Sequence, residues 1–305
     1  MSKSTKQFLR KEPNRERLKI KNQYLNYFKN LFMTNYEFKG VEKKENWFIL
    51  HAYWETGKIS GFILNEAGVK IPAYANFTEN MYDMYNYPIN ALPIAISSDW
   101  KLPKYMPKTP LKVDKEIVIS YINKTRTPIK EMVIYYVNRI VQIEMLMNSH
   151  INKLKMPFLV AVSPEDKEKM EDIIDRILND EEVVYLSAND IANLKTLINN
   201  TPYILDKLLQ HEKALINEVL TRLGINNVDI EKKEHLIVDE ANANNELISD
   251  NGDIYLKEME KFCEECNALL GTSMSVESTT AAHLLENMNQ EDTSEEEENE
   301  DDSNN

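Results

Sequence analysis

Residues 127–155 carry the longest uninterrupted apolar pattern in the chain, and this pattern limits the possible folds more than any other feature. The segment opens with Thr127 and Pro128, a pair typical of a helix start, because the hydroxyl can cap the helix and proline tolerates its first position. No glycine or proline follows before Lys155. A helix over this segment would be roughly 40 Å long. The chain must therefore contain an elongated helical part.

Apolar side chains surround most of this expected helix. Its polar positions fall on one narrow stripe, made of Glu131, Asn138, Gln142 and Ser149. The apolar positions take up most of the remaining surface: Ile129, Met132, Val133, Tyr136, Val137, Ile140, Ile143, Met147 and Ile151. A helix that is apolar on so much of its circumference must be surrounded by neighbours. In a chain of 305 residues, we expect these neighbours to include other subunits.

A second long helix is predicted over residues 202–224, with Gly224 as its stop. Its polar residues follow two adjacent lines: Asp206, Gln210, Lys213, Asn217 and Thr221 on one, and Lys207, His211, Glu218 and Arg222 on the other. Between the two long helices, residues 156–201 indicate a small α/β insert, in which "PFLVAVS" and "EEVVYLS" are strands on either side of a helix. Because the links are short, we expect the two long helices to run antiparallel.

The first part of the chain predicts an amphipathic helix followed by a sheet. Apolar residues recur at helical spacing over residues 15–33. Residues 34–126 contain short apolar or alternating runs, including "NWFILHAYW", "KISGFIL" and "EIVISYI", which we predict to be strands. Near the C-terminus, a helix is expected over residues 253–270, ending at Gly271.

Charge is distributed unevenly along the chain, whose net charge is −14. Residues 1–30 hold nine basic residues against Glu12 and Glu16, whereas residues 286–305 hold ten acidic residues and no basic one. Both ends are expected to be disordered, because such segments cannot bury enough apolar surface. The acidic tail either keeps the protein soluble or masks basic surface from nucleic acid, and the charge alone favours the first role.

The chain lacks the sequence motifs of common enzymes. It has no P-loop, no dinucleotide-binding fingerprint and no nucleophile elbow, and its seven glycines are too few to suggest a phosphate-cradling loop. Acidic pairs such as Asp172 with Asp175 fit solvated helix faces better than catalytic groups. We therefore expect no enzymatic activity and no cofactor.

The two cysteines, Cys263 and Cys266, lie in a helical pattern as "CEEC". A redox site would be expected after a strand, and a zinc site needs further ligands nearby, so two reduced thiols are the favoured interpretation. The histidines follow no ligand spacing, and we expect no metal. The charged N-terminus and the lack of a long apolar run predict neither a secretory signal nor a membrane span.

Residues 225–246 form a long polar stretch of mixed charge without proline or glycine. They belong to a region, residues 200–271, that contains five distinctive runs: "PY" with "DK" at 202–207, "LGI" at 223–225, "EKKE" at 231–234, "VDE" at 238–240 and "NALLG" at 267–271. In these runs, which keep the family's order without gaps, the region resembles the upper collar proteins of small short-tailed Bacillus phages, also called connector or portal proteins. Residues 150–200 resemble the family more loosely, and residues 1–149 resemble it in layout.

The resemblance implies an α+β fold in which long stem helices form an oligomeric ring. A small sheet domain would make the wide end of the ring, and a small SH3-like α/β insert its narrow end. The implied divisions are a basic arm at 1–14, an N-terminal helix at 15–33, a wide-end (wing) sheet at 34–126, a stem helix at 127–155, a narrow-end (clip) insert at 156–201, a second stem helix at 202–224, a channel loop at 225–246, a wide-end helical region at 247–285 and an acidic tail at 286–305.

The implied function is a twelve-subunit portal at one vertex of a phage head, at the head–tail interface of the virion and assembled in the host cytoplasm. Double-stranded DNA would pass through its centre during packaging and ejection. A long polar loop is then understandable, since it would meet moving DNA rather than a core. The candidate channel residues are Lys207, Lys213, Lys232, Lys233 and His235. The candidate arm residues for binding nucleic acid or the motor are Lys3, Lys6, Arg10, Lys11, Arg15 and Arg17.

The expected partners are other copies of the chain, double-stranded DNA, a packaging ATPase, the major capsid and scaffolding proteins, and lower collar or tail proteins. Whether a packaging RNA also binds stays open, and no membrane is expected. The alternative function is a helical nucleic-acid-binding or scaffolding protein of phage assembly, which uses the basic arm and masks it with the acidic tail. A hydrolase that uses the acidic pairs is a third and weaker hypothesis.

Overall fold

The computed structural model describes residues 12–66, 68–96, 106–155, 158–161, 195–198, 203–227 and 238–279. The chain divides into two compact units. Unit 1 contains residues 1–20 and 138–216, and unit 2 contains residues 21–137 and 217–305. Helices and strands occur together along the chain, as expected for an α+β protein. None of the helices in the described segments is long and apolar enough to cross a bilayer.

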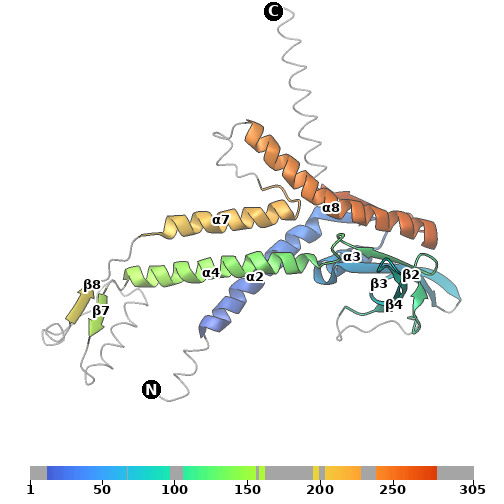
Figure 1. The fold of residues 1–305 in the computed structure, drawn as a ribbon, viewed down its shortest axis with the longest axis horizontal. Helices are drawn as coiled ribbons and strands as arrows, with labels where there is room; N and C mark the ends of the chain where they lie inside the picture. Colours follow the sequence, from blue (N-terminus) through green and yellow to red (C-terminus); the bar gives the residue numbers. More distant parts are fainter. Residues whose placement is uncertain are drawn as a thin grey trace, which may run out of the picture. The chain divides into compact units, whose positions relative to one another are not determined.

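Unit 2 contains a five-stranded antiparallel sheet in the order β5-β4-β3-β2-β6. Figure 1 labels β2, β3 and β4 of this sheet. Its strands are β2 (Lys58–Glu66), β3 (Val69–Tyr82), β4 (Pro88–Ile94), β5 (Leu111–Lys112) and β6 (Ile117–Tyr121). Phe62, Phe77, Ala91 and Ile117 are fully buried in the core of this sheet. The expected strands "KISGFIL" and "EIVISYI" are therefore confirmed.

The segment "NWFILHAYW" is a helix, not the strand predicted from its sequence. It lies in α3 (Lys43–Thr56), which starts with a capping box between Glu42 and Glu45 and ends at Gly57 with φ +72°. A short apolar run fits a buried strand and a buried helix equally well, and the flanking capping signals decide between them. One side of α3 is buried at Ile49, Leu50, Tyr53 and Trp54, a helical spacing.

Helix α8 (Val238–Leu270) is longer than expected. It begins inside the polar stretch predicted as a loop over 225–246, and fifteen residues before the helix start expected at 253. It packs against β2 and β6, so that Phe262, Cys263 and Cys266 are buried. After α8, β9 (Ser275–Ser278) pairs antiparallel with β1 (Tyr36–Lys39). The region 247–285 thus contains a strand as well as a helix.

Helix α2 (Glu12–Asn35) starts three residues earlier than the expected 15–33. Residues 12–14 are therefore helical, not part of a disordered arm, and residues 1–11 lie outside the described part of the chain. In unit 2, Phe28 and Phe32 of α2 are fully buried. The Phe32 ring lies 5.9 Å from the Trp54 ring and 5.4 Å from the Tyr36 ring, so aromatic contacts hold α2 against α3 and β1.

Helix α4 (Ile129–Lys155) confirms the long helix expected from residues 127–155. Much of its apolar surface is covered within the single chain, since Val133, Val137, Ile140 and Val141 are almost completely buried. The single chain thus covers part of the apolar surface of α4, and contact with other subunits stays a prediction. Tyr135, Leu146 and Ile151 stay exposed.

Helix α7 (Leu205–Arg222) confirms the second long helix. In unit 2, the Tyr136 hydroxyl near the start of α4 lies 3.4 Å from Oε1 of Glu218 near the end of α7. The start of α4 thus contacts the end of α7, and the antiparallel course of the two helices stays a prediction.

In the insert of unit 1, β7 (Phe158–Ala161) confirms the strand expected in "PFLVAVS". Its antiparallel partner is β8 (Lys195–Ile198), which the sequence did not suggest. The second predicted strand, "EEVVYLS", and the predicted helix between the strands lie outside the described residues.

Candidate nucleic-acid interface

Helix α7 positions the two described candidates for the channel. It carries Asp206 in its first turn and Arg222 in its last, an order that matches the helix dipole. The helix ends at Arg222, and the turn that follows contains Gly224, whose φ is +68°. A Cβ atom at Gly224 would overlap the Cα of Gly252 on α8, so this close approach requires glycine at position 224.

Lys207 and Lys213 are both exposed on α7. They lie on the two different polar lines expected from the sequence, and the structure does not bring them together. Within the described segments, neither amine takes part in an ion pair. Both side chains can therefore reach a polyanion.

The two polar lines differ at the end of α7 that lies in unit 2. On the first, which contains Lys213, Thr221 is buried, and its hydroxyl accepts a hydrogen bond of 2.7 Å from the Asn227 side chain. On the second, which contains Lys207, Glu218 and Arg222 form an exposed ion pair of 2.8 Å. The Arg222 guanidinium lies 5.5 Å from the centre of the Tyr136 ring. The second line thus stays on the surface, whereas the first is covered at its end.

The remaining channel candidates, Lys232, Lys233 and His235, lie outside the described residues. They precede Val238, where α8 begins. The described part of the predicted channel loop consists of residues 225–227 and of 238–246, the helical start of α8.

The basic arm is described only at its end. Arg15 and Arg17 are exposed on α2, whereas Lys3, Lys6, Arg10 and Lys11 lie outside the described residues. Between the two arginines, Glu16 accepts a hydrogen bond of 3.4 Å from Asn148 of α4, in unit 1. This contact attaches the end of the arm to a long helix and leaves both arginines at the surface.

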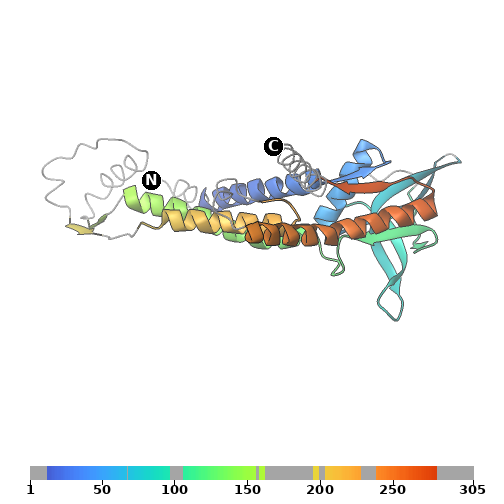
Figure 2. The same ribbon diagram turned by 90° about the horizontal axis from the view of Figure 1, so that it is seen from above.

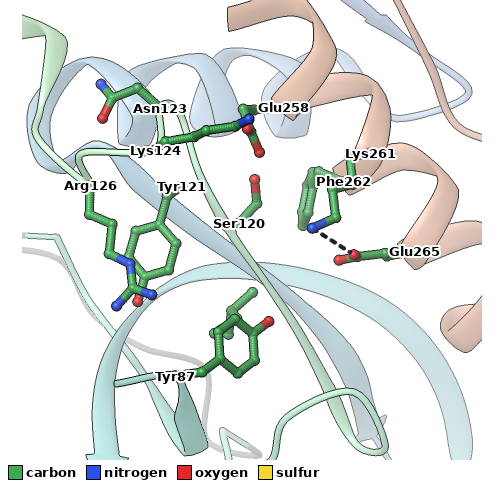
Figure 3. Close-up of a pocket in the computed structure, with 11 residues that line it drawn as sticks. Tyr87, Ser120, Tyr121, Asn123, Lys124, Arg126, Glu258, Lys261, Phe262 and Glu265 are labelled. Atoms are coloured by element: carbon green, nitrogen blue, oxygen red, sulfur yellow. Dashed lines mark ion pairs between the residues drawn. The ribbon is translucent and has the colours of Figure 1, made fainter. Parts of the chain in front are cut away.

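A cleft of mixed charge in unit 2 was not expected from the sequence (Figure 3). It has a volume of about 260 Å³, and its charged lining residues are Lys124, Arg126, Glu258, Lys261 and Glu265. They come from the segment after β6 and from α8. These segments are far apart in sequence, so no local pattern predicts that their side chains line one cleft.

Few groups of this cleft are free to act on a ligand. Lys261 and Glu265 are 3.5 Å apart, and burial raises the pKa of Glu265. Arg126 covers the Tyr121 ring at 4.8 Å and donates a hydrogen bond of 3.2 Å to the carbonyl of Asn86. The hydrogen bond to Asn86 ties the turn of the β3–β4 hairpin to the segment that leads from β6 into α4.

Cys263 and Cys266 are free thiols in the core, in agreement with the interpretation as two reduced thiols. Burial raises the pKa of Cys263 to about 12 and that of Cys266 further. The Cys266 sulfur faces Gly61 of β2, where a Cβ atom would lie only 2.8 Å from it. The described residues contain no group of three or more side chains suited to hold a metal ion.

Solved structures that are similar to the chain include the following two. A chain from the portal and tail of native bacteriophage P68 shares 15% identity at a TM-score of 0.47, and the match covers 96% of this chain and 98% of the other. The HK97 family phage portal protein from Corynebacterium diphtheriae shares 11% identity at a TM-score of 0.41, with 86% and 94% covered. The family model described as Phage Connector (GP10) matches residues 3–282, nearly the whole sequence, and the chain therefore belongs to the phage connector family.

Proposed function

We propose that this connector is the portal of a phage head: a dodecameric ring at one vertex, through which double-stranded DNA is packaged and later ejected. The observation that carries the proposal is the family match over residues 3–282. In this role the ring serves capsid assembly by joining the major capsid and scaffolding proteins, and then docks a packaging ATPase and the lower collar or tail proteins. The protein itself would be a passive conduit without enzymatic activity.

Exposed apolar side chains on the long helices support a role in an oligomer. Single exposed apolar residues are ordinary, but here each long helix bears at least one. They are Leu18 and Tyr27 on α2, Tyr135, Leu146 and Ile151 on α4, Leu209 on α7, and Leu247 and Ile254 on α8. Contacts between copies would remove them from water, and head-to-tail contacts between identical chains form a ring when the rotation between neighbours closes.

The charge of α7 suits a surface along which DNA moves. Lys207 and Lys213 are exposed together with the acidic residues Asp206 and Glu218. Each ion pair with a phosphate releases counterions and strengthens binding, so a channel lined only by lysine would hold DNA in place. A few lysines, repeated by the symmetry of the ring, would guide the duplex without trapping it. Lys232, Lys233 and His235 would add to this set.

The basic arm is the proposed contact with nucleic acid or with the motor. Arg15 and Arg17 are exposed on α2, and Lys3, Lys6, Arg10 and Lys11 precede them in the sequence. Arginine and lysine clusters of this kind attract phosphate groups, including those of a packaging RNA.

Labelling of phage particles tests the portal role directly. Particles carrying an epitope on the chain would be incubated with gold-labelled antibody after gentle opening of the head. The proposal predicts one labelled vertex per head, at the end that joins the tail. Label spread over the inner surface of empty precursor heads, and lost on maturation, would instead favour the alternative of a scaffolding protein.

A further inference from the structure

The tip of the β3–β4 hairpin in unit 2 exposes an unusual amount of apolar surface. Met84 is 86% exposed and Tyr85 is 79% exposed, and Met81 and Tyr82 beside them are also largely exposed. Contiguous exposed apolar side chains of this kind mark interaction sites rather than ordinary surface. We call residues 81–85 the hairpin tip.

Hydrogen bonds of Asp83, from both its side chain and its backbone, hold the hairpin tip in one conformation. The Asp83 carboxylate accepts hydrogen bonds from the backbone amides of Tyr85 and Tyr87, at 2.9 and 2.8 Å. The amide of Asp83 donates to the Tyr87 carbonyl at 2.9 Å, which closes the turn. A rigid tip loses little conformational entropy when it binds, so Met84 and Tyr85 are presented ready for a partner.

A groove of about 540 Å³ lies between α2 and α3 of the same unit. Met33, Trp47 and Leu50 supply its apolar lining, and Lys43 and Lys44 lie at its rim. Trp47 is half exposed, and its ring stacks on His51 at a centroid distance of 4.7 Å, which fixes its orientation. We call this the α2–α3 groove.

We propose that the hairpin tip of one copy docks into the α2–α3 groove of the next copy around the ring. The inference deepens the proposed function and rests on the ring that it requires. In Figure 2 the β3–β4 hairpin points away from α2 and from the start of α3, so the two surfaces lie on opposite sides of unit 2. A contact between two different surfaces of identical chains is head-to-tail, which is the kind that closes into a ring.

The chemistry of the two surfaces is complementary. Met84 brings a polarizable thioether to a groove that contains an indole, and sulfur–aromatic contacts are favourable. Tyrosine and tryptophan are also the residues that most often dominate binding at protein interfaces. Asp83 at the tip is exposed and acidic, whereas Lys43 at the rim of the groove is exposed and basic; Lys44 beside it pairs with Glu42 at 2.7 Å. Charge of opposite sign at the edge of a contact favours the correct orientation.

Cross-linking between single cysteines tests this contact. Met84→Cys places a thiol on the tip, and Thr34→Cys places one at the groove, where Thr34 is exposed. The native Cys263 and Cys266 are buried and make a low background. With a short bis-maleimide, the double variant should give a ladder of multimers on a denaturing gel. A mixture of the two single variants should stop at dimers, and each single variant alone should stay monomeric.

Two results would overturn the contact. Dimers from Met84→Cys alone would mean that two tips meet, and no ladder from the double variant in rings seen by electron microscopy would mean that the tip lies elsewhere. A ladder without closed rings would keep the contact and contradict the proposed portal. The absence of both the ladder and the rings would contradict the contact as well as the proposed portal.

Two substitutions at the hairpin tip measure how much it contributes to ring assembly. Met84→Ser with Tyr85→Ser should raise the protein concentration needed for half-maximal ring assembly about tenfold or more. The matched control, Val69→Ser with Ile71→Ser, changes two exposed apolar residues at the other end of β3 and should shift it less than about twofold. If the tip variant forms rings normally but fails to enter heads, the tip binds the capsid protein and the contact between copies is wrong.

Discussion

Lys130 on α4 places its Nζ 2.6 Å from Oε2 of Glu55 on α3, while Lys29 on α2 lies 2.8 Å from the other carboxylate oxygen. One carboxylate thus links three helices of unit 2. Burial opposes ionisation of Glu55, yet the hydrogen bonds from Lys130 and Lys29 outweigh it and lower the pKa of this carboxyl.

Glu55→Gln should lower the free energy of unfolding by about 2 kcal/mol, because it leaves two partly buried ammonium groups without their shared anion. Urea unfolding at fixed protein concentration measures the loss. Glu37→Gln is the matched control, since Glu37 forms an exposed pair with Lys39 and should cost less than about 1 kcal/mol. Equal effects of the two substitutions would contradict a structural role for Glu55.

His51 should make unit 2 sensitive to mild acid. Burial, followed by the charge of Lys29, lowers the pKa of His51, and Lys29 Nζ lies 2.8 Å from its Nδ1. The unfolded chain therefore binds more protons than the folded one just below pH of about 6.5. The stability contributed by neutral His51 is present above that pH and should be lost as the pH falls through the lowered pKa.

Thermal unfolding measured between pH 7.5 and 5 would show this loss. His51→Gln should flatten the profile in that range, because the substituted side chain does not titrate. His211→Gln, at an exposed position of α7, should leave the wild-type profile unchanged. A wild-type profile that is flat down to pH 5 would contradict this account of His51.

Gly224→Ala should destabilise the junction between α7 and α8. The substitution adds a Cβ both to a backbone with φ of +68° and to the contact with Gly252. Gly271 has a similar φ of +71° but nothing within 4 Å of its added Cβ. Gly271→Ala should therefore cost about 1 kcal/mol from backbone strain alone, and Gly224→Ala about 2 kcal/mol or more. Equal costs, measured by urea unfolding, would show that the close approach is unimportant.

Lys207→Ala and Lys213→Ala test the proposed channel face. Together they should weaken the binding of duplex DNA to purified rings about tenfold at low salt and make the salt dependence shallower, because fewer counterions are released. Since the two lysines lie on different polar lines of α7, the single variants identify the line that faces DNA. Lys108→Ala with Lys115→Ala, both exposed outside α7, is the control. Unchanged binding, packaging and retention of DNA would show that neither lysine faces the channel.

The long helices were predictable because their signals are repeated over many residues. The apolar spacing of α4 and α7 extends over several turns, and the glycine stops at Gly224 and Gly271 both lie at helix ends with positive φ. An apolar spacing of 3.6 residues that extends over several turns indicates a helix and fits a strand or a loop poorly.

Features that depend on contacts between distant segments were not predictable. The run "NWFILHAYW" is too short for its periodicity to distinguish a helix from a strand, and its packing against Phe32 lies beyond any local pattern. The pairing of β1 with β9 joins residues more than two hundred positions apart. The first turns of α8 are rich in asparagine and aspartate, which have weak helix propensity, so the sequence suggested a loop there.

The candidate site was predictable only in part. The pattern correctly indicated that Lys207 and Lys213 lie on polar lines of a helix, but the covering of Thr221 by Asn227 comes from the chain's return after Gly224. The hairpin tip and the α2–α3 groove carry no motif at all. They were recognised as possible binding surfaces only from the exposed fractions of their side chains and from their place on the fold.

Electron microscopy of the purified protein, with class averages viewed along the particle axis, tests the central claim most directly. The account predicts closed twelve-fold rings with a central hole wide enough for duplex DNA. Monomers, dimers or open chains of irregular length at high protein concentration would contradict it.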